Sequence, residues 1–388
     1  MRIGIDARLW NETGVGRYIR NLVKHLQLLD KENEYVLFVR NDSGGNFKIQ
    51  ITNDKWRVVH ADVRWHSLAE QWEMPKVLEK EKLDLVHFPY FNVPVFYNKP
   101  FIVTIHDLII NHFPTGQATT LPWPLYQIKR LGYQTSLSHA VRNSQKIIAV
   151  SETTKGEIVD HFGVKPEKVV VTYESGELEI NKNHESGIMN HGIKKPYILY
   201  VGNAHPHKNL ERLMEAFNQI KNQKSKIKMT NHDLKLILVG KDDYFYQRLK
   251  NWVETMGLSE RVVFYGEASD AELRHLYKNA TALILPSLME GFGLPALEAM
   301  GQGCLVLASD IFAFREVCEG AAIYFDPLDI DAIAKTIEQV CSHDLPAGKA
   351  GSNHSNKIND GLKRAKIFSW EKMAKETLNI YKEAAVCL

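Results

Sequence analysis

The sequence predicts an α/β fold in two halves, each a doubly wound parallel sheet. Short apolar strands alternate with helical segments from the first residues onward, as in a parallel sheet covered by helices. The alternation stops in a polar stretch near residues 174–195 and then restarts. The chain's 388 residues also exceed one ordinary core and fit two domains.

The first half begins with a strand at residues 1–7, a helix at residues 16–28 and a strand at residues 34–39. Further apolar strands follow at residues 82–87, 101–105, 146–150 and 168–172. We expect residues 1–175 to form a Rossmann-like N-terminal domain. Residues 176–195 are polar, contain glycine and lack periodicity, which predicts a linker.

The second half repeats the pattern over residues 196–367, the predicted C-terminal domain. Its expected strands lie at residues 197–201, 234–239, 262–265, 282–285 and 305–309, with helices at 209–220, 243–256, 271–278, after 294 and from about 329. Residues 344–360 are rich in Gly, Ser and Asn, which predicts an exposed loop or a lengthened helix connection. Residues 368–388 should form a serine-capped amphipathic helix that packs back on the first domain.

Composition narrows the class of protein. Lys and Arg number 48 against 46 Asp and Glu, and the formal charge of +2 gives no global field for nucleic acid. Cys304, Cys318, Cys341 and Cys387 lack metal-site spacing, which predicts reduced thiols. No apolar run approaches the roughly 20 residues that span a bilayer. We expect a cytoplasmic protein, with peripheral contact to the inner face of the cell membrane as an alternative.

In each half, a glycine-containing loop follows the first strand. In TGVGRY (residues 13–18), Gly14 and Gly16 let backbone amides approach an anion, although Ile19 replaces the third glycine of a dinucleotide fingerprint. Dinucleotide binding, a tight structural turn and an anion loop therefore remain open. In YVGNAHPHKNL (residues 200–210), Lys208 stands at a helix start, where an anion would compensate its charge. It is a diphosphate ligand or a solvated lysine.

The ends of two further strands carry candidate site residues. In VTIHD (residues 103–107), His106 can contact a substrate hydroxyl, carry protons, or serve only structure. EGFGLPALEAM (residues 290–300) reads as a loop and short helix after a buried strand, with seven residues between Glu290 and Glu298. Ligands of open α/β sheets bind outside the carboxyl ends of strands.

Together these motifs resemble a family of retaining nucleotide-sugar glycosyltransferases, family four, whose members have the GT-B fold: two Rossmann-like domains with a cleft between them. The resemblance covers nearly the whole chain, in the segments at residues 6–8, 14–16, 87–94, 105–107, 149–155, 201–210, 285–300 and 368–374. It implies that Glu298 binds the donor ribose. It also implies that Glu290 and the following loop face the donor's sugar and diphosphate, through Gly291, Phe292, Gly293 and Leu294.

The same resemblance assigns the diphosphate to Gly14, Gly16, Lys208 and His207, and places His106 at the donor sugar near the reacting carbon. Family members commonly pair an arginine with the lysine, whereas this sequence has Asn203 and His207 at those positions. A histidine donates fewer hydrogen bonds than an arginine and is mostly neutral near pH 7, so phosphate binding is expected to be weaker or pH-sensitive. Arg212, one turn further along, is the alternative replacement.

Metal-independent transfer without a cofactor is expected, because Lys208, helix N-termini and loop amides can stabilise a departing phosphate. We interpret Asp329-Ile-Asp331 as a helix cap rather than a metal site. A front-face substitution is the family's usual proposal, and Glu290 is the candidate nucleophile for a double displacement. Loss of transfer in Glu290→Gln would show that the residue matters. Only a trapped glycosyl-enzyme would show that Glu290 is a nucleophile.

The sequence most resembles the bacterial mannosyltransferase branch that builds polysaccharide and O-antigen chains. GDP-mannose is therefore the expected donor, a UDP-sugar is the alternative, and the acceptor is a hydroxyl of a glycan or lipid-linked glycan. Residues 119–142 mix apolar and basic side chains, which favours either membrane docking or an ordinary half-buried helix. A non-catalytic nucleotide-sugar-binding protein and a GT-B epimerase or phosphorylase remain alternatives.

Overall fold

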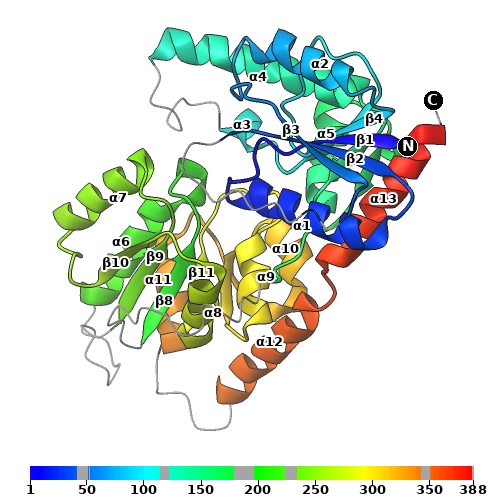
Figure 1. Ribbon diagram of the computed structural model, residues 1–388. Coiled ribbons are helices and arrows are strands. Elements are labelled where there is room, and N and C mark those ends of the chain that lie inside the picture. The colour runs from blue at the N-terminus through cyan, green and yellow to red at the C-terminus, as the bar shows by residue number, and fades with distance from the viewer. Residues whose placement is uncertain are drawn as a thin grey trace. The chain divides into compact units, whose positions relative to one another are not determined.

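The computed structural model describes residues 1–41, 51, 53–113, 122–178, 196–222, 234–341 and 350–386. Contacts divide the chain into two units, one formed by Met1–Glu174 with Ser369–Leu388 and the other by Ser175–Phe368. Each unit contains one parallel sheet with helices packed around it (Figure 1). The predicted fold of two doubly wound parallel-sheet domains is confirmed. Most of the predicted linker, residues 179–195, lies outside the described residues.

The first unit has a seven-stranded sheet in the order β3-β2-β1-β4-β5-β6-β7. Its strands are β1 (Arg2–Asp6), β2 (Glu34–Val39), β3 (Trp56–His60), β4 (Leu85–Phe88), β5 (Phe101–Ile105), β6 (Ile147–Ala149) and β7 (Val169–Val171). Its helices are α1 (Gly14–Leu29), α2 (Glu70–Lys80), α3 (Ile109–His112), α4 (Trp123–Asn143), α5 (Glu152–Phe162), the 3₁₀ turn η1 (Pro166–Lys168) and α13 (Trp370–Val386). The strand order reverses between β1 and β4, so loops diverge there and leave room for a ligand.

The second unit has a six-stranded sheet in the order β10-β9-β8-β11-β12-β13. Its strands are β8 (Tyr197–Val201), β9 (Lys235–Val239), β10 (Val262–Gly266), β11 (Ala282–Leu285), β12 (Val306–Ser309) and β13 (Ala322–Phe325). Its helical segments are η3 (Pro206–Lys208), α6 (Leu210–Asn222), α7 (Tyr244–Thr255), α8 (Asp270–Asn279), α9 (Leu294–Gly301), α10 (Phe312–Cys318), η4 (Glu319–Ala321), α11 (Ile330–Cys341) and α12 (Ala350–Ala365). The order reverses between β8 and β11, so a crevice for a ligand is expected at the carboxyl ends of these two strands.

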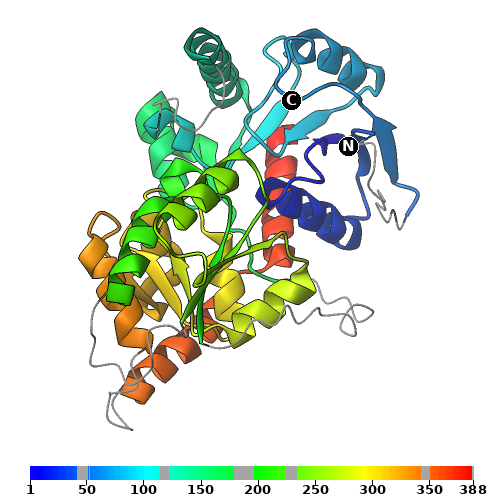
Figure 2. The same ribbon diagram turned by 90° about the vertical axis from the view of Figure 1, so that its left-hand side faces the viewer.

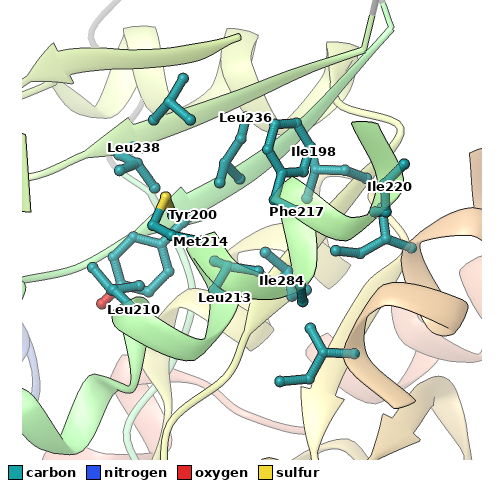
Figure 3. Close-up of a cluster of buried hydrophobic side chains, with 14 of the residues drawn as sticks. Ile198, Tyr200, Leu210, Leu213, Met214, Phe217, Ile220, Leu236, Leu238 and Ile284 are labelled. Atoms are coloured by element: carbon teal, nitrogen blue, oxygen red, sulfur yellow. The ribbon is translucent and has the colours of Figure 1, made fainter. Parts of the chain in front are cut away.

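Helix α6 forms the centre of a buried apolar cluster in the second unit (Figure 3). Its apolar residues recur at helical spacing and are buried against side chains of β8, β9 and β11: Leu210, Leu213, Met214, Phe217 and Ile220. Burying one such side chain fully contributes about 1.5–3 kcal/mol relative to exposure. This packing fixes the start of α6, and therefore the loop that precedes it and carries Lys208.

Helix α13 closes the first unit after the chain has completed the second. It packs against α1, and the two helices lie side by side in both views (Figures 1 and 2). Met373 and Tyr381 are fully buried, and the Tyr381 hydroxyl lies 2.7 Å from Nδ1 of His87 in β4. The predicted return of the C-terminal helix to the first domain is confirmed.

Helix α12 corrects one expectation. Residues 350–360 were expected in a loop or a lengthened connection, but they belong to this helix, whereas residues 344–349 lie outside the described residues. Lys357 Nζ donates hydrogen bonds to the carbonyls of Gly320 and Ala322, and Gly361 lies where an added Cβ would be 3.0 Å from Met300 Cγ. Tertiary packing on α9 and η4 therefore overrides the weak helix propensity of Gly, Ser and Asn.

Candidate active site

Asn209 joins the loop between β8 and α6 to the segments that follow β11 and β13. This residue has a left-handed backbone (φ 60°), and its side-chain Nδ2 donates hydrogen bonds to the carbonyls of Pro286 (3.0 Å) and Pro327 (2.8 Å). Arg212 in turn donates to Asn209 Oδ1 at 2.9 Å. Arg212 therefore supports the loop in this structure, and the loop holds Lys208 at the point where the strand order reverses.

Lys208 and Glu290 form an ion pair at this point. Lys208 Nζ lies 2.7 Å from Glu290 Oε1 and 2.9 Å from Oε2, and the Ser287 hydroxyl donates to Oε1 at 2.6 Å. The side chains are 16% and 12% exposed, so the pair is largely shielded but reachable from solvent. An incoming anion would compete with Glu290 for the ammonium group. The sequence singled out both residues, and the structure brings them together.

The loop from Gly291 to Leu294 turns directly into helix α9. Gly293 precedes the helix with φ 97° and ψ 48°, a left-handed conformation, and an added Cβ would lie 2.7 Å from the Phe314 ring. Phe292 is buried and packs edge-on against Phe368, with ring centroids 5.7 Å apart. Helix N-termini favour anions, but in this first turn Pro295 lacks an N–H and the Ala296 amide donates a hydrogen bond of 3.0 Å to the Gly293 carbonyl oxygen.

Glu298 lies within α9 and is only 5% exposed. Its Oε2 accepts a hydrogen bond of 2.8 Å from the hydroxyl of Tyr277, a fully buried residue of α8. Gly176 lies so close that an added Cβ would be 2.4 Å from the backbone nitrogen of Glu298. Both contacts fix the carboxylate and its backbone. Sequence reasoning missed Tyr277, and no local pattern connects it with Glu298.

His207 lies beside the ion pair, but its ring stays neutral. Burial, with smaller contributions from the charges of Lys208 and His205, lowers the pKa of His207 to about 2. Its backbone carbonyl accepts a hydrogen bond of 2.8 Å from the Leu288 amide, which joins the two loops. A neutral imidazole still offers one N–H to a phosphate. In the ligand-free site, burial and the neighbouring Lys208 thus favour the neutral ring.

The remaining site residues belong to the first unit. His106 follows β5, with Nδ1 at 3.0 Å from Glu174 Oε1 and Nε2 at 2.9 Å from the Pro89 carbonyl oxygen. Gly16 lies in the first turn of α1, where an added Cβ would be 2.6 Å from the Trp10 carbonyl oxygen. Gly14 has no atom within 4 Å of an added Cβ. Close backbone packing thus requires a glycine at position 16 but not at position 14.

The predicted helix cap at Asp329 is confirmed. Its Oδ1 accepts hydrogen bonds from the amides of Asp331 (2.9 Å) and Ala332 (3.1 Å) at the start of α11. Across the part of the chain that the structure describes, no group of three or more His, Cys, Asp or Glu side chains could hold a metal ion. Cys304, Cys318 and Cys341 are free thiols, whereas Cys387 lies outside the described residues.

Comparison with known proteins identifies the family. Residues 13–174 match the family model described as Glycosyltransferase Family 4, and residues 179–357 match the model described as Glycosyl transferases group 1. The chain belongs to the family-four glycosyltransferases. It is a nucleotide-sugar-dependent glycosyltransferase with the GT-B fold, as the sequence motifs predicted.

Two curated relatives of this glycosyltransferase are bacterial. An O-antigen chain mannosyltransferase of Salmonella typhimurium is 32% identical over 66% of this chain and 65% of its own length. O-antigen chain mannosyltransferase B of Escherichia coli is 28% identical over 95% of this chain and 96% of its own length. Sucrose-phosphate synthase from Thermosynechococcus elongatus has the same fold, with a TM-score of 0.76 at 18% identity and full coverage of both chains. Anabaena HepE, solved with UDP and glucose, has a TM-score of 0.71 at 16% identity and covers 99% of this chain and 100% of its own.

Gly293→Ala is expected to lower the activity of this glycosyltransferase at least about 10-fold. The alanine Cβ would displace either the buried Phe314 ring or the loop, and a strained left-handed residue costs about 1–3 kcal/mol. Thermal unfolding and nucleotide release, measured on the same preparation, separate the loss of stability from the loss of activity. Gly320→Ala is the matched control, because an added Cβ there has no atom within 4 Å. Wild-type activity in Gly293→Ala would contradict the assigned loop conformation.

Proposed function

We propose that this glycosyltransferase moves mannose from GDP-mannose to a hydroxyl of a glycan or lipid-linked glycan, with retention and without a metal ion. The observation that carries the proposal is the Lys208–Glu290 pair, which lies beside the start of α9 in the unit that also holds Glu298. A cation and helix amides suit a diphosphate, and carboxylates suit sugar hydroxyls. The two relatives named as O-antigen chain mannosyltransferases support mannose as the sugar.

In this proposal the second unit binds most of the donor. Glu298 accepts hydrogen bonds from the ribose hydroxyls, and Lys208, with His207 and the loop amides, neutralises the diphosphate. Glu290 meets the sugar together with the loop of Gly291, Phe292, Gly293 and Leu294. The family resemblance assigns the Gly14–Gly16 loop to the donor diphosphate and His106 to the donor sugar, and we keep both assignments as part of the proposal.

The reaction proposed is a substitution on one face of the sugar. The acceptor oxygen forms a bond to the anomeric carbon while the bond from that carbon to the phosphate oxygen breaks, and the acceptor's proton passes to the departing phosphate. No side chain then needs to act as a base. Glu290 is hydrogen-bonded by Lys208 and Ser287, which stabilises its charge and weakens it as a nucleophile. This geometry favours a sugar-binding role for Glu290.

Incubation with a panel of GDP- and UDP-sugars tests the proposal. Release of GDP from GDP-mannose that depends on an acceptor and persists with EDTA would support it. Release of UDP would instead identify a UDP-sugar donor, and loss of activity with EDTA would refute metal independence. Binding without turnover would indicate a non-catalytic protein, and inverted sugar stereochemistry without nucleotide loss would indicate an epimerase.

We also propose that α4 docks on an anionic membrane surface that carries the acceptor. Four of its large apolar side chains, all in its N-terminal half, are more than half exposed: Trp123, Leu125, Ile128 and Leu131. Its buried residues all lie in its C-terminal half, from Ser136 to Val141. In Figure 1 the start of α4 extends away from the sheet of its unit. Lys129 is also exposed and suits anionic headgroups. No helix within the described ranges is long and apolar enough to cross a membrane.

The double variant Ile128→Glu with Leu131→Glu is expected to lower binding to phosphatidylglycerol-containing vesicles at least about 10-fold. Both side chains are about two-thirds exposed, at 69% and 66%, so the variant removes apolar contact with lipid and adds repulsion from its charge. Co-sedimentation measures the bound fraction, with phosphatidylcholine vesicles for comparison. Leu328→Glu, at a residue 62% exposed in the second unit, is the matched control. Equal binding by the double variant and the wild type would refute this docking surface.

A further inference from the structure

His106 is held between two hydrogen-bond acceptors. Its Nδ1 lies 3.0 Å from Glu174 Oε1, and its Nε2 lies 2.9 Å from the backbone carbonyl oxygen of Pro89. A carbonyl oxygen only accepts, and an ionised carboxylate only accepts. Both contacts can be hydrogen bonds at once only when both ring nitrogens carry hydrogen. With an ionised Glu174, the geometry therefore requires the imidazolium form of His106.

The electrostatic surroundings agree with this form. Burial opposes a charged ring, but the hydrogen bond to Glu174, the charge of Glu174 and the Pro89 carbonyl outweigh it and raise the pKa of His106. Glu174 is only 3% exposed, so solvent screens the pair little. The Tyr18 ring packs edge-on against His106 with centroids 5.1 Å apart, which leaves the imidazole little freedom to turn.

Three ionisable groups around His106, two tyrosines and a histidine, do not change charge near neutral pH. Burial raises the pKa of Tyr18 in α1 and of Tyr90 after β4 above their ordinary values. Burial also lowers the pKa of His87 in β4 to about 3. Asp107 on the same loop adds a negative charge that favours the imidazolium. From α5, Thr154 contacts the His106 carbonyl with an uncharged hydroxyl, at 3.4 Å.

We propose that Glu174 is a positioning residue that fixes His106 as an imidazolium, and that sugar transfer requires this form. The proposal rests on the proposed function, in which His106 contacts the donor sugar. An imidazolium with both N–H groups engaged cannot take a proton from the acceptor hydroxyl. His106 then contributes a fixed charge and a fixed ring orientation. The VTIHD motif allowed proton transfer by His106 as one role, and this proposal replaces that role with a fixed positive charge.

The first test measures the charge of His106 directly. In protein labelled with ¹³C and ¹⁵N at histidine, a His106→Gln spectrum assigns the resonance, and a pH titration follows it. His106 should titrate above its ordinary value of 6.5 in the wild type. In Glu174→Gln it should titrate below 6.5, because burial remains while the negative charge is gone. Glu174→Asp should lie between the two. Wild-type titration at or below 6.5 would overturn the proposal.

The second test links that charge to transfer through the pH profile of nucleotide release. Because the pKa of His106 is raised, the imidazolium persists at low pH and disappears as pH rises through that pKa. Activity should therefore fall on the alkaline side. In Glu174→Gln this fall should move to lower pH by about the shift seen in the titration, at least one pH unit, with partial rescue in Glu174→Asp. An unmoved alkaline limb alongside a shifted titration would overturn the link to transfer.

Two controls keep these results interpretable. Burial and the charge of Asp107 raise the pKa of Glu157 in α5 to about 7, so Glu157 also titrates in this range. Glu157→Gln removes that titration and should retain the alkaline limb assigned to His106. The titration requires no donor. If no nucleotide sugar is turned over, the proposed function and the link to transfer fail, while the titration still decides whether Glu174 fixes the charge of His106.

Discussion

Replacing Lys208 with methionine is expected to reduce the turnover of nucleotide sugar about 100- to 1,000-fold. Methionine keeps much of the length of the side chain but removes the cation that would face the departing diphosphate. Removing one preorganised electrostatic donor from an active site typically has an effect of this size, because the donor acts most on charge that develops in the transition state. Steady-state kinetics should show a lower kcat in addition to any change in KM.

The control for this prediction is Lys335→Met, at an exposed lysine of α11 in the same unit. It removes the same charge at a distance from the Lys208–Glu290 pair and should leave kcat/KM within about twofold of the wild type, since surface substitutions rarely matter. Thermal unfolding of Lys208→Met checks for misfolding. A Lys208→Met enzyme with wild-type kcat/KM would show that the diphosphate is neutralised elsewhere, and Arg212 would then be the first residue to test.

The sequence predicted the central strands of both sheets better than their edges. Strands β1, β5, β8 and β11 are almost completely buried, so they form short apolar runs that a sequence reveals. The sequence analysis did not predict the partly buried edge strands β3 and β13, although it did predict the other two edge strands, β7 and β10. Sequence pattern therefore finds buried central strands more dependably than partly buried edge strands.

The site shows the same limit at the level of single residues. The sequence singled out Lys208, Glu290 and Glu298 because each lies in a motif that follows a strand. Their supports could not, because Tyr277 meets Glu298 only through the packing of α8 on α9, and Glu174 meets His106 only through the order of the strands. Such contacts depend on tertiary register, which local spacing does not contain. The hydrogen-bonding partners of a motif residue therefore need a structure.

Glu298→Ala is expected to weaken the binding of GDP or UDP about 100-fold or more, in a calorimetric titration without any sugar. Hydrogen bonds to a charged group contribute about 1.5–3 kcal/mol each, and the proposed ribose contact uses the carboxylate for two hydroxyls. Tyr277→Phe should have a smaller effect, roughly 10-fold, because Glu298 keeps its charge but loses the hydroxyl that orients it. Thermal unfolding of both variants measures the accompanying loss of stability.

The ribose assignment is tested most sharply by pairing Glu298→Ala with 2′-deoxy-GDP. If the carboxylate binds the ribose, the wild type should lose affinity for the deoxy nucleotide, while Glu298→Ala should bind GDP and 2′-deoxy-GDP equally. The two losses should then fail to add, as expected of groups that interact directly. Additive losses would mean that Glu298 supports α9 without touching the ribose. In that case its burial and its contact with Tyr277 would describe a structural glutamate, and the ribose ligand would have to be sought elsewhere in the second unit.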